Sequence, residues 1–88
     1  MEIKLKLYGS SKILSDKEIL NIQLPNNSNI EKLRIFLAKI ISEQHFAVKL
    51  KNLPKTAAFF SEKNIVIHDG YKLKNKELIS IIPPIGGG

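Results

Sequence analysis

Residues 2–8 and 18–24 alternate between apolar and polar positions, which is typical of β-strands with one buried face. The residues between them, 9–17, are polar and include a glycine, so they indicate a loop. Two neighbouring strands joined by such a loop predict an antiparallel pair. The apolar side of the pair, which we expect to point into the core, comprises Ile3, Leu5, Leu7, Leu20, Ile22 and Leu24.

Residues 30–43 are the one segment with clear helical periodicity. Pro25-Asn26-Asn27 ends the preceding strand, and either Ser28 (with Glu31 in a capping box) or Asn29 is expected to cap the helix. The opposite side of the helix is charged, so the apolar stripe should lie on a sheet. That stripe comprises Ile30, Leu33, Leu37 and Ile40 or Ile41.

The second half of the chain predicts three more strands. Residues 45–55 are irregular and basic; "TAAFF" and "NIVIH" then flank a turn-like "SEKN", and "LISII" (78–82) is the last strand. If the first and last strands pair in the centre they lie parallel, with the helix in the right-handed crossover between them. This order predicts an α+β fold of the β-grasp (ubiquitin-like) type, with a mixed sheet and one main helix on one face. The expected organisation is a β-grasp domain over residues 1–82 and a tail over 83–88.

Alternation within the strands also predicts which apolar residues lie on the face away from the helix. Ile65 and Ile67 are expected to point inward, whereas Tyr8, Val66 and Ile82 are expected to point outward. An apolar patch on an open sheet face indicates a partner surface, although scattered exposed apolar residues are also common. We therefore take Tyr8, Val66 and Ile82 as a candidate partner interface.

The composition narrows the possible functions. The 88 residues carry a net charge of +6 and no cysteine, and only Arg34 of the 14 basic residues is arginine. Evenly spread lysine without arginine forks or stacked aromatics does not favour nucleic acid. No apolar run is long enough for a membrane span, and the alternating start is unlike a signal peptide, so a cytoplasmic protein is expected.

Catalytic chemistry is sparse along the chain. The two histidines, His45 and His68, have no ligand or base at a defined spacing, so no metal site is expected. The eight carboxylates are scattered, and no glycine-rich loop precedes a helix. We therefore expect no autonomous catalytic site and no bound cofactor.

The end of the sequence, "PPIGGG", is the most distinctive segment. Pro83 and Pro84 cannot continue a central strand and should direct the chain outward in an extended form. Ile85 provides one apolar anchor. Gly86, Gly87 and Gly88 have no Cβ, so they can enter a narrow channel and leave the carbonyl carbon of Gly88 accessible to a nucleophile.

Several segments together resemble the small subunit of molybdopterin synthase (the MoaD family), which is related to the ThiS-like sulfur carriers. "LISIIPPIGGG" resembles the C-terminus of that family, and "IKLKLYGSSKIL" its first strand and loop. "NIEKLRIFLAKI" is similar to its helix, and "TAAFF" takes the place of its third strand. The resemblance covers nearly the whole chain, and its specificity depends mainly on the tail.

The resemblance implies a ubiquitin-like sulfur carrier. An E1-like (MoeB-like) adenylyltransferase would use ATP to activate Gly88, which would become a thiocarboxylate. The tail (Pro83, Pro84, Ile85, Gly86, Gly87) would then enter a MoaE-like large subunit and donate sulfur for the dithiolene of the molybdenum cofactor. Three alternatives stay open: a carrier for thiamine or tRNA thiolation, a protein modifier joined to lysines through Gly88, and a basic interaction module.

Overall fold

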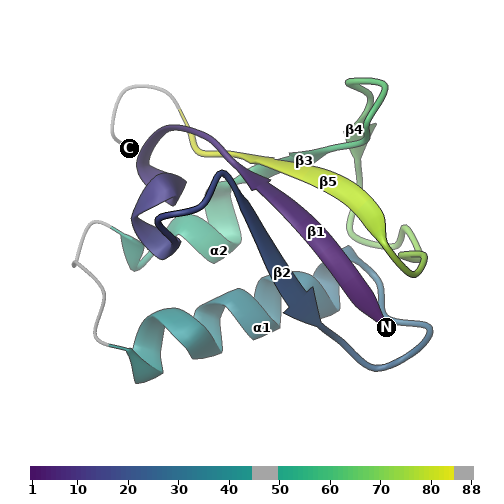
Figure 1. Cartoon of the computed structure of the whole chain (residues 1–88), viewed down its shortest axis with the longest axis horizontal. Coiled ribbons are helices and arrows are strands. Elements are labelled where there is room, and N and C mark those ends of the chain that lie inside the picture. Colours follow the sequence, from purple (N-terminus) through teal and green to yellow (C-terminus); the bar gives the residue numbers. More distant parts are fainter. Residues whose placement is uncertain (45–49, 85–88) are drawn as a thin grey trace.

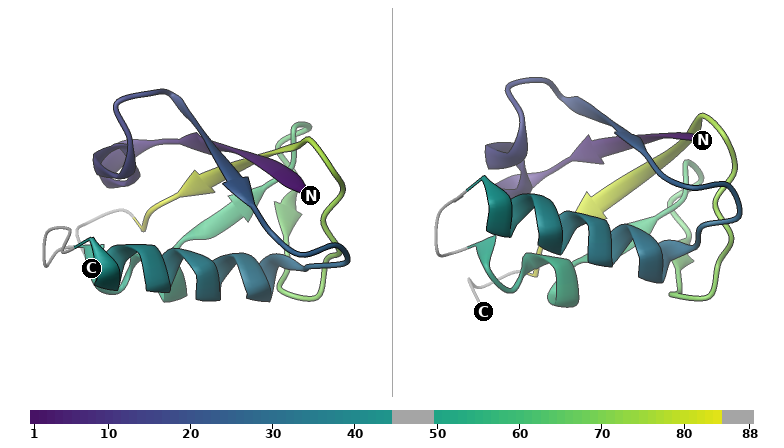
Figure 2. Two further views of the ribbon diagram at one scale, coloured as in Figure 1. Left: turned by 60° about the horizontal axis from the view of Figure 1, so that its bottom comes forward. Right: turned by 90° about the horizontal axis from the view of Figure 1, so that it is seen from below.

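The computed structural model describes residues 1–44 and 50–84. They form a five-stranded sheet with the long helix α1 packed along one side of it (Figures 1 and 2). The elements follow one another as β1 (Glu2–Leu7), the 3-10 helix η1 (Gly9–Leu14), β2 (Ile19–Gln23), α1 (Ile30–Glu43), α2 (Leu53–Thr56), β3 (Ala58–Phe60), β4 (Val66–Ile67) and β5 (Glu77–Ile82).

The sheet has the strand order β2-β1-β5-β3-β4. The first and last strands lie side by side and parallel, with Leu5 opposite Ile79, and β2 pairs antiparallel with β1. The antiparallel β3 and β4 complete the other side of β5. The predicted α+β fold with a central parallel pair is therefore confirmed.

Helix α1 begins and ends where its periodicity predicted. Of the two candidate caps, Asn29 is the one used: its side-chain oxygen accepts a hydrogen bond from the backbone N–H of Lys32 at 3.0 Å. Ser28 is buried instead and donates its hydroxyl to the carbonyl of Pro25. The stripe that packs on the sheet comprises Ile30, Leu33, Leu37 and Ile41.

The core lies between α1 and the facing side of the sheet. Every second residue of the two central strands is buried, as the alternation predicted, and Phe59 on β3 fills the space beside them. This side of the sheet contributes Ile3, Leu5, Leu7, Phe59, Ile79 and Ile81, none of them more than 1% exposed.

Three local predictions were wrong. The expected loop 9–17 contains the 3-10 helix η1, and α2 begins within the stretch 45–55 that was expected to be irregular; residues 45–49 of that stretch are outside the described part. Ile65 was expected to point inward but is 62% exposed. Asn64 has a left-handed backbone (φ 61°), so the turn resets the alternation and β4 begins only at Val66.

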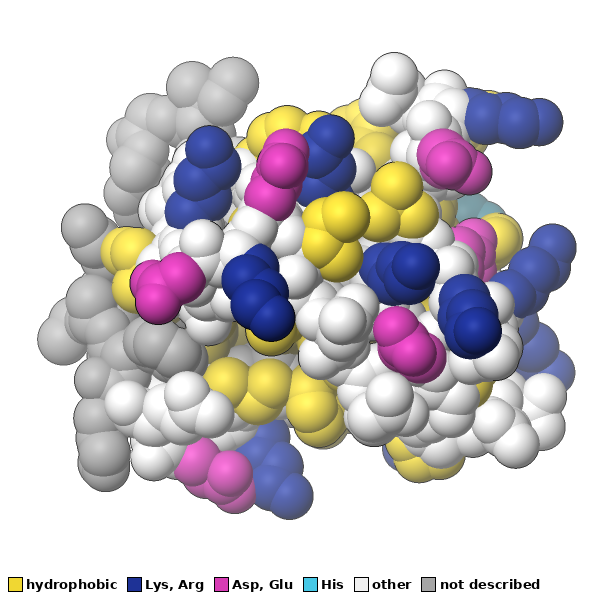
Figure 3. Space-filling view, viewed as in Figure 1, with side chains coloured by type: hydrophobic (Ala, Val, Ile, Leu, Met, Phe, Trp, Pro, Cys, Tyr) yellow, Lys and Arg dark blue, Asp and Glu magenta, His cyan; other side chains and the backbone are white. Residues whose placement is uncertain are grey.

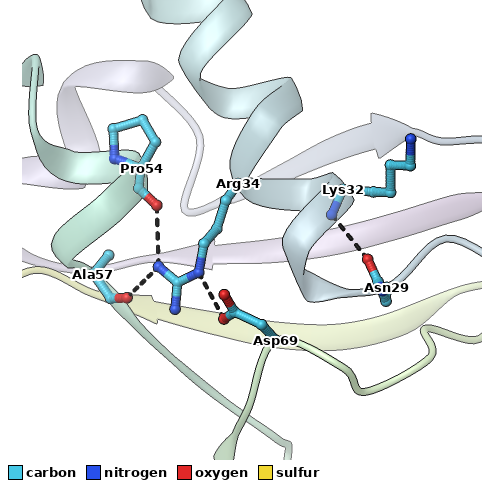
Figure 4. A network of polar contacts seen from close by, with 6 residues as sticks. All are labelled: Asn29, Lys32, Arg34, Pro54, Ala57 and Asp69. Carbon is cyan, nitrogen blue, oxygen red and sulfur yellow. Dashed lines mark hydrogen bonds and ion pairs between the residues drawn. The ribbon is translucent and has the colours of Figure 1, made fainter.

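The single arginine joins three parts of the fold (Figure 4). From α1, the Arg34 side chain donates one hydrogen bond to Asp69 at 2.9 Å and two more to the carbonyls of Pro54 and Ala57, at 3.0 and 2.8 Å. Its guanidinium also lies over the ring of Phe59, 4.8 Å from the centroid. A planar, multiply donating group is needed to bind these acceptors together, which explains why this one position is arginine among so many lysines.

Candidate functional site

The tail leaves the sheet at the end of β5, beside the start of η1. Pro83 is half-buried and its ring packs on Gly9: a Cβ at Gly9 would lie 3.6 Å from Cγ of the proline. Pro84 follows and is exposed. A proline here ends the hydrogen-bonded ladder because it has no N–H to donate. The remaining predicted tail residues (Ile85, Gly86, Gly87, Gly88) lie outside the described residues.

The backbone under Pro83 is held by a buried serine. Ser11 is fully buried, and its hydroxyl both accepts from the N–H of Tyr8 at 2.9 Å and donates to the Tyr8 carbonyl. Gly9 then turns with φ +55°, a conformation that costs a residue with a Cβ about 1–2 kcal/mol. The base of the tail therefore rests on a fixed turn.

The three residues predicted for the partner interface lie on the face of the sheet away from α1. Val66 is 62% exposed and Tyr8 37%, whereas Ile82 is half-buried beside Ala58 of β3. Lys6 shares this face, because its ammonium lies 5.4 Å from the centroid of the Tyr8 ring. The Tyr8 side chain, and more weakly Glu18, raises the pKa of Lys6.

Sequence reasoning missed two further members of this outer face. Phe60 lies between Val66 and Ser80 in the strand register, and Ile19 lies opposite Lys6 on the other side. The outward position of Phe60 could have been predicted from strand alternation. Consecutive residues of a strand point to opposite faces, so one of the two phenylalanines of "AAFF" had to point outward. Figure 3 shows hydrophobic side chains over the middle of the sheet, among Lys, Arg and acidic side chains.

The histidines do not form a site in the part of the chain that is described. His68 is exposed, and His45 lies among the residues outside that part. Over residues 1–44 and 50–84, no group of three or more His, Cys, Asp or Glu side chains could hold a metal ion. Within the same ranges, no helix is both long and apolar enough to cross a membrane.

Comparison with solved structures decides the fold type. A putative molybdopterin converting factor subunit 1 from Pyrococcus furiosus superposes with a TM-score of 0.70 over 96% of this chain and 98% of its own, at 15% identity. SAMP1 from Haloferax volcanii superposes with a TM-score of 0.67 at 11% identity, covering both chains fully. The chain has the β-grasp fold.

A third similar structure is the complex of subunits 1 and 2 of the molybdopterin-converting factor from Helicobacter pylori. One of its chains superposes with a TM-score of 0.62 over the full length of both chains, at 22% identity. No protein-family model and no curated protein sequence matches the chain. The likeness to the three structures therefore concerns the fold, and function has to be argued from this chain's own residues.

Proposed function

We propose that this protein is the sulfur-carrier small subunit of a molybdopterin synthase. The observation that carries the proposal is the way in which the central strand β5 passes directly into the tail: Pro83 leaves the sheet against Gly9, and the sequence then runs on to Gly88. The fold that this chain shares with molybdopterin converting factor subunit 1 supports the same function.

The proposed chemistry takes place at the Gly88 carboxylate. An E1-like (MoeB-like) enzyme joins it to the α-phosphate of ATP and releases pyrophosphate, which turns a poor acyl donor into an acyl-adenylate. A sulfur nucleophile then attacks the carbonyl carbon, AMP leaves, and Gly88 carries a thiocarboxylate. Each thiocarboxylate would pass one sulfur to a pterin precursor bound by a MoaE-like large subunit, and hydrolysis of the acyl group would return the Gly88 carboxylate. Two charged carriers would therefore be consumed for the two sulfurs of one dithiolene.

This chain contributes position and access rather than catalysis. Pro83 and Pro84 restrict the backbone at the base of the tail, so fewer tail conformations have to be given up on binding. The glycines that follow have no side chain, so they suit a narrow channel in another protein. ATP would be bound by the activating enzyme and not by this subunit.

The outer face of the sheet is also suited to binding a protein partner. Tyr8 and Val66 present apolar surface on the side of the sheet that α1 leaves open, and Ile82 leads from that face into the tail. A large subunit that covers this face would hold the tail close to its own active site. We propose Tyr8, Val66 and Ile82, together with Phe60, as its contact residues.

The decisive experiment is the intact mass of the protein after incubation with the activating enzyme, ATP and a sulfur donor. Replacement of one carboxylate oxygen by sulfur adds roughly 16 Da by atomic masses. A variant lacking Gly87 and Gly88 should gain no mass and should show an unchanged circular dichroism spectrum. No mass gain in the intact chain, with an enzyme shown to be active on its own carrier, would exclude the carrier function.

Further assays separate the remaining alternatives. Added large subunit and pterin precursor should consume the thiocarboxylate, whereas a thiazole or tRNA pathway would leave it intact until its own acceptor is added. A protein modifier would instead leave its C-terminal peptide on target lysines; in tryptic digests of cell lysate this remnant is Glu77–Gly88, because Lys76 is the last basic residue. A basic interaction module would keep its function without Gly87 and Gly88.

A further inference from the structure

A groove of about 620 Å³ opens on the outer face of the sheet, at the end where β5 begins. Lys4 and Leu78, neighbours in the register of β1 and β5, are half-buried and line its floor. Ile19 at the start of β2 adds a second apolar side chain and is 37% exposed. The groove therefore has two apolar side chains, on either side of β1 and its Lys4.

The walls of the groove are loops rich in lysine. The turn between β3 and β4 provides Lys63, and the loop before β5 provides Lys74 and Lys76, all three exposed. In Figure 3, Lys and Arg side chains gather at the right of the view, at the end of the sheet where β5 begins. Four lysines and two glutamates line the groove in all: Lys4, Lys63, Lys74, Lys76, Glu62 and Glu77.

One of the two glutamates is already occupied by hydrogen-bond donors. Glu77 accepts from the Tyr71 hydroxyl at 2.5 Å and from the backbone N–H of Lys74 at 2.8 Å. Among residues 1–44 and 50–84 there are three ion pairs, and none of them includes a lysine of the groove. The groove lysines therefore have no ion-pair partner within those residues, and their ammonium groups can meet an anionic group there.

The backbone at Lys76 has a conformation that lysine rarely adopts. Three non-glycine residues of the described chain have positive φ; two are asparagines, which tolerate this conformation, and the third is Lys76 at φ 64°. A glycine or asparagine would fold there with less strain. Such local strain is typical of sites where the side chain itself is needed.

We propose that this groove binds an acidic peptide segment of a partner protein. Its carboxylates would meet Lys63, Lys74 and Lys76, and an apolar side chain would lie on Leu78 between them. The groove favours a peptide over nucleic acid: no arginine lines it, and its one aromatic residue, Tyr71, is partly buried and packs against the core.

The groove is separate from the base of the tail. Leu78 precedes Pro83 by five residues of an extended strand, roughly 16 Å at about 3.3 Å per residue. A partner held in the groove would therefore leave the end of β5 uncovered. This inference goes beyond the proposed sulfur transfer and does not need the terminal glycines.

Fluorescence anisotropy with a short labelled peptide of alternating glutamate and leucine tests the proposal. Binding is expected to weaken steeply with added salt, as for an association carried by charge. A peptide of alternating lysine and leucine should not bind, and one of glutamate and serine should bind less tightly because it has nothing to place on Leu78. A single-stranded oligonucleotide that binds better than the acidic peptide would overturn the choice of partner.

Charge-reversed variants locate the site. Lys63→Glu with Lys74→Glu should weaken peptide binding by at least about tenfold, because attraction becomes repulsion. The matched control is Lys32→Glu with Lys55→Glu, which makes the same charge change on α1 and α2 and should leave binding within about twofold. Equal losses in both variants would show net-charge attraction alone and would refute the groove.

Lys76→Asn separates charge from folding. Asparagine tolerates the left-handed backbone, so the thermal midpoint should stay the same or rise, while peptide affinity falls severalfold. Deletion of Gly87 and Gly88 should leave peptide binding unchanged, so failure of the carrier proposal and failure of the groove proposal give different results. Unchanged affinity in Lys76→Asn would count against the role of this lysine.

Discussion

Gly9 and Pro83 lie next to each other although they are 74 positions apart in the sequence, the glycine at the start of η1 and the proline directly after β5. The contact exists because β1 and β5 run parallel, so both strands end at the same edge of the sheet. The positive φ of Gly9 turns the chain beneath the proline ring. The direction in which the tail leaves the domain is thus set by a turn from the other end of the chain.

We expect Gly9→Ala to lower the free energy of unfolding by about 1 kcal/mol, because alanine is strained at φ +55°. Its Cβ would meet Pro83 at an ordinary contact distance, so strain rather than a clash is the cause. Gly9→Asn should cost clearly less, since asparagine tolerates this conformation. Urea unfolding measures both; equal losses would mean that backbone strain is not responsible.

Arg34→Ala should destabilise the fold by roughly 2–3 kcal/mol, because three acceptors on separate elements lose their donor. Arg34→Lys should recover little of this loss, since one ammonium cannot reproduce the planar fork. Asp69→Asn is the comparison: Asp69 is 54% exposed at its side chain, so its share of the pair should be below about 1 kcal/mol. Full rescue by lysine would contradict the role of the guanidinium geometry.

The hydrogen bond to Glu77, together with partial burial, raises the pKa of Tyr71 above its usual value of about 10. Because the folded state holds this proton more tightly, the stabilisation is complete below about pH 10 and is lost as the pH rises above it. The difference in thermal midpoint between the wild type and Tyr71→Phe should therefore shrink from about pH 8 to about pH 11. The thermal midpoint of Glu77→Gln should likewise depend less on pH over this range than that of the wild type. A difference between the wild type and Tyr71→Phe that grows with pH would contradict this hydrogen bond.

Val66→Glu should weaken binding to a large synthase subunit while changing the free energy of unfolding by less than about 1 kcal/mol, because Val66 is 62% exposed on the edge strand β4. Ile35→Glu is the matched control: Ile35 is 57% exposed on α1, at the other side of the molecule. Calorimetric titration with the large subunit distinguishes the two. Equal affinities for both variants would remove the outer face from the proposed interface.

Phe59 and Phe60 are consecutive residues of β3 that lie on opposite faces of the sheet, so their substitutions should differ in cost. Phe59→Ala should cost about 3–5 kcal/mol, because its ring is fully buried in the core. Phe60→Ala should cost much less, because Phe60 is on the outer face and only half-buried. Denaturant unfolding checks both, and comparable losses would mean that the two faces of β3 are not assigned correctly.

The elements with a long and regular pattern could be predicted from the sequence: the central strands, the helix α1 and the order that makes a β-grasp. Local periodicity is enough there, because one buried face repeats over several residues. Local periodicity gave the wrong prediction at Ile65, where the left-handed backbone of Asn64 resets the alternation. It also missed η1 and α2, which are too short to show a period. The role proposed for the tail glycines also comes from the sequence, since it depends only on their lacking a side chain.

The contacts between residues that are distant in the sequence became visible in the folded structure alone. Gly9 lies beside Pro83 because two strands from opposite ends of the chain are parallel neighbours. Arg34 can donate to both α2 and the segment before β5 because both lie against α1. The lysine groove likewise depends on register, which places Lys4 beside Leu78, and on two loops that flank them. Such contacts depend on how the elements pack, and no local pattern in the chain contains that information.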